Sequence, residues 1–191
     1  MRPLRSALLL GLASSTLTGC TLIAPNPVPV RVTQSNGFGL LRPTIPGTNG
    51  ARVQFITQPV YIVDATGHLT PSSRIVAAPA SLASVIQQLL LGPSAIEKAA
   101  GFTSALPPKL VLITADIRGG VGYVNLASSF TNLSRKNQLL AVGQLVLSAY
   151  LVGASRGVVL KVAGVVQSLL LPNGSHATLA SENAFRVLLN R

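Results

Sequence analysis

The spacing of apolar residues predicts extended structure at the start of a folded region that begins near Val53. The run Val60-Tyr61-Ile62-Val63 is rich in β-branched and aromatic residues, which favour strands. Asp64-Ala65-Thr66-Gly67 has the composition of a turn, and residues 69–76 form a second, less regular extended segment. The pattern therefore predicts that a strand opens the fold.

Helical spacing begins shortly after these extended segments. Behind Ser81, a suitable N-cap, apolar residues recur at positions i, i+3, i+4, i+7 and i+8. These residues are Leu82, Val85, Ile86, Leu89 and Leu90. Gly92-Pro93 then supplies the glycine and proline that commonly end helices. These signals predict one helix between Ser81 and Gly92.

A second helix is predicted over residues 136–152, with apolar residues on two of its sides. One side is lined by Leu139, Val142, Val146, Ala149 and Tyr150. No charged residue occurs from 137 to 155, so a membrane span and a deeply buried core helix are the two alternatives. The polar residues Gln138, Gln144 and Ser148 favour the core helix.

The remaining pattern predicts a hairpin, a late strand and a short closing helix. Residues 110–117 and 121–126 are strands joined at Gly119-Gly120, because glycine supplies the positive φ of tight hairpins. The later segments are a strand at 157–166, an extended piece at 167–171, a turn at 172–175 and a helix at 182–189. The order βαββαβ, with C-terminal additions, predicts a two-layer α+β domain with a mostly antiparallel sheet and two main helices.

The chain is strongly basic, with 15 Lys and Arg, four Asp and Glu, and a formal net charge of +11. Such a surplus attracts anionic neighbours, which for an exported protein are lipid headgroups or acidic wall polymers. The basic residues are scattered, and only Arg135-Lys136 are adjacent. No aromatic residues interleave with them as a stacking platform for nucleic acid would require. A solvated basic surface and a specific anion site remain the alternatives, and no nucleic-acid partner is expected.

The beginning of the chain has the order of a bacterial secretory signal. A basic start and a short apolar stretch lead through small residues to Cys20, the only cysteine. Leu17-Thr18-Gly19-Cys20 resembles a lipobox, in which the cysteine sulfur receives a diacylglycerol. We therefore expect a lipoprotein signal peptide at 1–19, cleavage between Gly19 and Cys20, and lipidation with palmitate at Cys20. A free cysteine in an ordinary signal peptide or in a buried N-terminal helix is the alternative.

Residues 20–52 differ in composition from the rest of the chain. Prolines, glycines and asparagines recur in this segment, which predicts a tether that begins at the lipidated residue. The folded domain is predicted to occupy residues 53–191 and to have no disulfide, because it has no cysteine. This organisation predicts a protein held by its lipid on the extracytoplasmic face of the cell membrane.

Candidate catalytic and metal-binding residues are sparse. Gly153-Ala154-Ser155-Arg156-Gly157 fits Gly-x-Ser-x-Gly, but a nucleophile elbow needs a strand before the serine and a helix after it, the reverse of the order predicted here. His68 and His176 are isolated from each other and from any metal-binding spacing. Asp64 and Asp116 are expected to satisfy turns. We predict no catalytic residue, no metal and no cofactor, and hence no enzymatic activity.

Short motifs occur in a characteristic order over most of residues 59–171. They are the run from Val60 to Val63, Leu69-Thr70-Pro71, Arg74, Leu89-Leu90-Leu91-Gly92-Pro93, Ser104-Ala105-Leu106-Pro107, the segment Tyr123–Phe130 and the helix around Leu145–Tyr150. In this order they resemble the GerMN (sporulation and spore germination) domain. Two later segments, Leu171-Pro172-Asn173-Gly174 and the tail from Ser181 to Leu189, are similar to the extension found in actinobacterial lipoproteins of this group.

The resemblance implies a noncatalytic extracytoplasmic module linked to the cell envelope. Asn125 stands where an Asp is common in the family, and residues 162–165 lack the acidic residue of its late turn, so no acidic functional patch is expected. The leading hypothesis is a lipid-anchored module that binds an envelope protein or a wall polymer. A carrier of a lipid or a small apolar ligand is the alternative, suggested by the many aliphatic residues.

Overall fold

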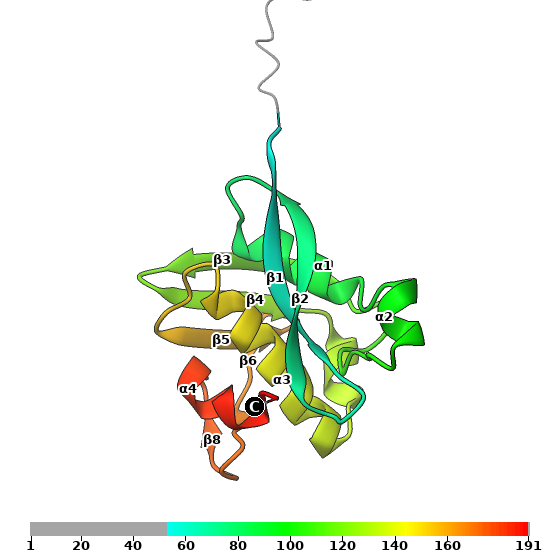
Figure 1. The fold of residues 1–191 in the computed structure, drawn as a ribbon. Helices are drawn as coiled ribbons and strands as arrows, with labels where there is room; N and C mark the ends of the chain where they lie inside the picture. Colours follow the sequence, from blue (N-terminus) through cyan, green and yellow to red (C-terminus); the bar gives the residue numbers. More distant parts are fainter. Residues whose placement is uncertain (1–52, 191) are drawn as a thin grey trace, which may run out of the picture. The chain divides into compact units, whose positions relative to one another are not determined.

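The computed structural model describes residues 53–190. The predicted signal peptide, the Gly19-Cys20 cleavage site, the lipidation site and the tether lie outside the described residues. The elements, drawn in Figure 1, are β1 (Phe55–Val63), β2 (Leu69–Ala77), α1 (Leu82–Leu90), α2 (Ala95–Ala99), β3 (Leu112–Arg118), β4 (Val121–Leu126), η3 (Ser128–Asn132), α3 (Arg135–Tyr150), β5 (Gly157–Val162), β6 (Val165–Val166), β7 (Leu169–Leu170), β8 (His176–Ala177), α4 (Glu182–Phe185) and η4 (Arg186–Leu188).

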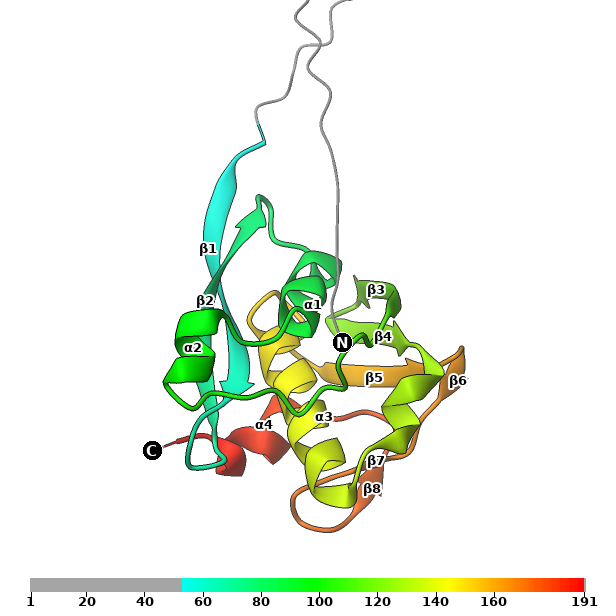
Figure 2. The same cartoon turned by 90° about the vertical axis from the view of Figure 1, so that its right-hand side faces the viewer.

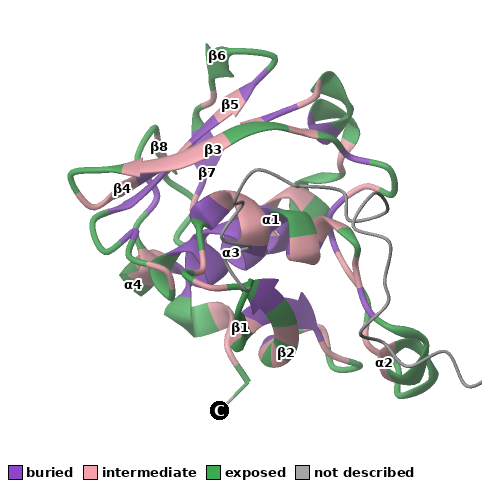
Figure 3. Ribbon diagram, turned by 90° about the horizontal axis from the view of Figure 1, so that it is seen from above, coloured by how far each residue is buried: buried purple, intermediate pink, exposed green. Residues whose placement is uncertain are grey.

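Two sheets enclose the main helices of this α+β fold. Strands β1 and β2 pair with each other in an antiparallel hairpin, and β3, β4, β5 and β6 form a separate four-stranded sheet in that order. Figure 3 shows α1 and α3 between the hairpin and the larger sheet. The predicted α+β class is confirmed, and the opening hairpin adds a layer to the two that the sequence predicts.

The four-stranded sheet is mostly antiparallel, as predicted. Strands β3 and β4 form the expected hairpin around Gly119-Gly120, whose φ angles are 54° and 77°. Strand β5 pairs with β4 in parallel, with Val124 opposite Leu160, because α3 carries the chain back across the sheet between them. The strand predicted over 157–166 is two strands, β5 and β6, separated by a turn at Ala163-Gly164.

Helix α3 is buried on all of its sides. Every residue from 140 to 149 is buried, because β1 covers one side of the helix and β5 another. The prediction of a core helix is confirmed, and no helix within residues 53–190 is long and apolar enough to cross a membrane. Tyr150, which the sequence places on one apolar side of the helix, is its last residue and is 38% exposed.

The two buried polar residues of α3 hold the opening hairpin in place. Gln144 donates from Nε2 to the Tyr61 carbonyl at 2.9 Å and accepts from the Ala105 N–H at 2.8 Å. Ser148, one turn further along the helix, accepts from the Tyr61 N–H at 2.9 Å. These bonds satisfy the N–H and carbonyl groups of Tyr61, which point away from the partner strand β2. Two side chains of a helix therefore bond to the edge of β1 where the backbone of a third strand would otherwise pair.

Local signals in the sequence account for the ends of α1. Ser81 is its N-cap, as predicted, and accepts from the Ser84 N–H at 3.1 Å. The helix ends at Leu90, just before Gly92, which has a φ of 72°. The segment predicted as irregular at 69–76 is the regular strand β2, and the sequence analysis did not predict α2.

The chain after β6 closes the core beside α3. The predicted turn at 172–175 joins β7 to β8, and the predicted closing helix consists of α4 followed by η4 (Figure 2). Phe185 of α4 is completely buried. Val158 of β5 and Ala180 exchange two backbone hydrogen bonds of 2.9 Å. The C-terminal segment is thus an integral part of the folded domain.

Candidate functional site

A surface groove lies between β2, the end of α1 and α2, and we call it the Arg74 groove. Its volume is about 640 Å³. The lining residues are Ser72, Ser73, Arg74, Ile75, Gln88, Leu91, Gly92, Pro93, Ser94, Ile96 and Glu97. Two of the motifs singled out in the sequence, Arg74 and the Leu89–Pro93 segment, meet in this groove. They are separated along the chain, and the fold brings them together.

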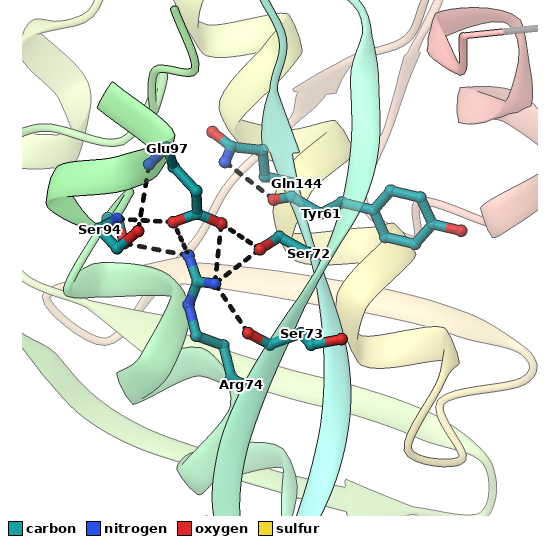
Figure 4. A network of polar contacts seen from close by, with 8 residues as sticks. Tyr61, Ser72, Ser73, Arg74, Ser94, Glu97 and Gln144 are labelled. Carbon is teal, nitrogen blue, oxygen red and sulfur yellow. Dashed lines mark hydrogen bonds and ion pairs between the residues drawn. The ribbon is translucent and has the colours of Figure 1, made fainter. Parts of the chain in front are cut away.

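The floor of the groove is a nearly buried ion pair between β2 and α2 (Figure 4). The two terminal guanidinium nitrogens of Arg74, Nη1 and Nη2, each donate to one oxygen of the Glu97 carboxylate at 3.0 Å, which is the bidentate geometry that fixes orientation. The two side chains are 13% and 17% exposed. Arg74 also donates to the carbonyls of Ser73 and Gly92, at 2.9 and 3.3 Å. The pair therefore joins β2 to the end of α1 and to α2.

Glu97 also caps its own helix. Its carboxylate accepts from the Ser94 N–H at 2.6 Å, and Ser94 Oγ accepts from the Glu97 N–H at 3.2 Å, which completes a capping box. Ser72 donates a further hydrogen bond to the carboxylate. Burial opposes the negative charge, but the bonds from Arg74, Ser72 and Ser94 outweigh it and lower the pKa of Glu97 to about 2. The carboxylate is therefore charged at every physiological pH.

Three aliphatic side chains project around this polar floor. Ile75 is 68% exposed, Leu91 is 74% exposed and Ile96 is 83% exposed. Clustered exposed aliphatic groups over a rigid base are typical of a surface that another protein covers. The one hydroxyl–carboxylate contact among the lining residues is that of Ser72 with Glu97. The carboxylate is already engaged by Arg74 and its pKa is lowered to about 2, which makes it a poor general base. The arrangement suits binding.

The candidate residues for metal binding and catalysis do not come together. Within the part of the chain that the structure describes, no three His, Cys, Asp or Glu residues could hold a metal ion. Ser155 lies in the turn after α3 and before β5, so a helix precedes it and a strand follows, as predicted. His68 contacts Thr66 Oγ1 through Nδ1 at 2.9 Å, and His176 lies in β8.

The two candidate aspartates have local structural roles. Asp64 accepts hydrogen bonds from Thr66, His68 and Thr70 within the β1–β2 turn, as predicted, and from Asn190. These bonds, that from the Thr66 side chain above all, hold the pKa of Asp64 well below its usual range. Asp116 instead forms an ion pair with Arg118 beside the β3–β4 turn. Each of the two carboxylates is thus bound by neighbouring residues, Asp64 through hydrogen bonds and Asp116 through an ion pair.

Asn125, the departure from the family pattern, has a structural role in the sheet. Its Oδ1 accepts from the Gly164 N–H at 3.0 Å and so ties β4 to the turn between β5 and β6. An amide oxygen accepts this bond as a carboxylate would, and it adds no charge. The geometry therefore explains how Asn125 replaces an acidic residue at this position.

Glu97 and Ile96 are the site residues that sequence reasoning missed. The signal that could have revealed them is the spacing Ser94-x-x-Glu97, a capping box that is typical of a helix N-terminus. The helix has only five residues, so no apolar periodicity accompanies the box. The pairing of Glu97 with Arg74 spans 23 positions and could not be obtained from spacing.

The fold is that of a small α+β module with a surface groove. The family model Germane, described as sporulation and spore germination, matches residues 59–168. This match covers more than half of the chain, and the protein therefore belongs to that family. The GerMN resemblance deduced from the motifs is confirmed. None of the curated protein sequences matches the chain.

Two solved structures share the fold. The tandem GerMN domains of the sporulation protein GerM from Bacillus subtilis match with a TM-score of 0.53 and 16% identity, over 67% of this chain and 46% of that one. The first GerMN domain of the same protein matches with a TM-score of 0.52 and 18% identity, over 67% and 98%. This chain thus spans about half of the tandem structure. At such identities the likeness concerns the fold alone.

Proposed function

We propose that this protein is a lipid-anchored, noncatalytic module on the extracytoplasmic face of the cell membrane, where it binds another component of the envelope through the Arg74 groove. The observation that carries the proposal is the convergence of two family motifs on one rigid groove with an aliphatic rim. The lipobox-like segment ending at Cys20 motivates the anchor. Membership of a family described by sporulation and germination is compatible with an envelope role.

The chemistry of the groove favours a protein as the bound component over a wall polymer. An acidic polymer would need unpaired cations, whereas the guanidinium of Arg74 is already engaged by Glu97. The rim offers aliphatic surface, which is most favourably buried against apolar side chains of a partner. A carrier of a lipid or a small apolar ligand remains the alternative, with the wall polymer as a second possible partner.

The groove variant Leu91→Asp with Ile96→Asp tests this proposal. Both side chains are exposed, so charge at these positions should leave folding intact while placing two carboxylates in the contact. The matched control, Val165→Asp with Val187→Asp, changes two valines that are 65% and 64% exposed and lie in β6 and η4. The full chain, with each pair of changes, is used to capture proteins from solubilised envelopes.

The proposal expects one defined envelope protein to be captured by the unmodified chain and by the control variant, and to be lost with the groove variant. Circular dichroism and thermal unfolding verify that both variants fold. Equal capture by the two variants would refute the assignment of the groove. Capture of purified wall polymer, unchanged by either variant, would instead support a polymer bound at another surface.

A further inference from the structure

A second groove lies at the start of α3, away from the Arg74 groove. It runs between the first turns of that helix and the β7–β8 hairpin, which lie side by side in Figure 2. Its volume is about 470 Å³, within the range of about 300–1,000 Å³ typical of ligand sites. The side chains that line it are Arg135, Lys136, Leu139, Leu170, Leu171 and Pro172.

The charge on this groove is uncompensated. Arg135 and Lys136 are exposed, and within residues 53–190 neither forms a salt bridge. The four Asp and Glu side chains, all within residues 53–190, are engaged elsewhere. Glu97, Asp116 and Glu182 pair with arginines, and Asp64 is held in the β1–β2 turn. The two adjacent cations therefore present their full charge to an anion from outside.

The rest of the groove is aliphatic. Leu170 is buried, Leu139 and Leu171 are partly buried, and no neutral polar side chain is among the lining residues. A bound peptide would bring amide groups, which lose free energy when they leave water without hydrogen-bond partners. An acyl chain has no such groups, and it gains free energy from contact with leucines. The lining therefore matches an anionic head and an aliphatic tail.

From this complementarity we infer that the groove binds an anionic phospholipid. Its phosphate lies against Arg135 and Lys136, and an acyl chain lies along Leu139, Leu170 and Leu171. This contact is separate from the Arg74 groove, so it stands whether or not that groove binds a partner. Arg135 and Lys136, two of the many basic residues of the sequence, thus form a specific anion site.

Short-chain lipids that stay dissolved as monomers test the inference by calorimetric titration. The protein is the full chain with Cys20→Ser, so that no attached lipid competes. Dihexanoyl phosphatidylglycerol carries both a negative charge and the acyl chains, dihexanoyl phosphatidylcholine carries the chains with a net neutral head, and glycerol phosphate carries an anionic phosphate without acyl chains. Phosphatidylglycerol is expected to bind most tightly. Phosphatidylcholine should bind at least about five-fold more weakly, the effect of losing a single charge contact. Glycerol phosphate should also bind more weakly, because it lacks the acyl chains that contact the leucines.

Variants that remove charge from the groove form the second part of this experiment. Arg135→Gln with Lys136→Gln should weaken phosphatidylglycerol binding about 25-fold, because each cation near an anionic lipid contributes about a five-fold effect. The control, Arg156→Gln with Lys161→Gln, removes the same charge from β5 and the turn before it, and should leave binding within about two-fold. Thermal unfolding verifies that both variants fold.

Several results would overturn the inference. Equal losses in the two variants would show attraction by net charge alone. Equal binding of phosphatidylcholine would show a purely apolar contact, and equal binding of glycerol phosphate would show a simple anion site. Displacement of the lipid by a short peptide of alternating Glu and Leu, at the same concentration as the lipid itself, would assign the groove to an acidic peptide.

Discussion

Replacing Gln144 by Met should destabilise the protein severely although the two side chains have similar size. Gln144 is completely buried, and its amide bonds to the Tyr61 carbonyl and to the Ala105 N–H. Methionine fills the same space but satisfies neither group. Each backbone group left buried without a partner costs about 1–3 kcal/mol, so the expected loss in the free energy of unfolding for the two groups is about 2–6 kcal/mol.

Urea denaturation followed by circular dichroism measures this loss. The control on the same helix is Gln138→Met, at a partly exposed position, where a change within about 0.5 kcal/mol is expected. Ser148→Ala removes the bond to the Tyr61 N–H and should cost about 1–3 kcal/mol. Because both side chains hold Tyr61, the double variant should deviate from additivity by at least about 0.5 kcal/mol.

A free energy of unfolding for Gln144→Met within about 0.5 kcal/mol of that of the unmodified chain, at an unchanged slope against urea, would refute this expectation. Such a result would mean that the hydrogen bonds from α3 to the edge of β1 do not stabilise the hairpin. It would also weaken the account of the Arg74 groove, because β2, which carries Arg74, pairs along its whole length with β1.

Three further predictions concern the ion pair, a close backbone contact and the anchor. The pKa of Glu97 is about 2 in the folded protein and 4.5 ordinarily, so its stabilising effect is complete above pH 4.5 and is lost as the pH falls toward 2. Glu97→Gln should therefore remove about 1–3 kcal/mol of this acid-dependent stability, measured by urea denaturation at several pH values. Parallel profiles of unfolding free energy against pH for the variant and the unmodified chain would contradict this prediction. Gly157→Ala should cost about 2–3 kcal/mol of stability in thermal unfolding, because the φ of Gly157 is 125° and an added Cβ would lie 2.7 Å from the Ala180 carbonyl oxygen. The control Gly174→Ala, where φ is also positive but the space is open, should cost about 1 kcal/mol. Equal costs would show that the backbone moves to relieve the contact with Ala180. Cys20→Ser should abolish acyl labelling and move the protein from the detergent phase to the aqueous phase, and labelling that persists would refute the lipid anchor.

Local patterns were sufficient to predict most elements of the fold. The cap at Ser81, the Gly119-Gly120 hairpin and the charge-free core helix follow from a few neighbouring residues, and the structure confirms them. The separate β1–β2 layer did not follow, because it depends on contacts between Tyr61 and Gln144, which are 83 positions apart. Periodicity reports which side of an element is buried and carries no information on its distant partner.

The candidate site was predictable only in part. Arg74 and the Leu89–Pro93 segment were singled out as motifs, but nothing in their spacing shows that they meet. Ile96 lies on a helix too short to have an apolar period, and its exposure is known only from the fold. Burial of the ion pair likewise depends on the packing of α2 against β2. A site formed by tertiary contacts thus required the structure.

Site-specific crosslinking in living cells tests the central claim, a partner bound at the Arg74 groove, most directly. A photoreactive amino acid at Ile96 places the probe on the most exposed side chain of the rim, and the same residue at Val165 in β6 is the matched control. The account predicts one discrete crosslinked envelope protein from Ile96 that is absent from Val165. Identical crosslinking patterns at the two positions, or none at Ile96 in cells that produce the protein at its native level, would contradict it.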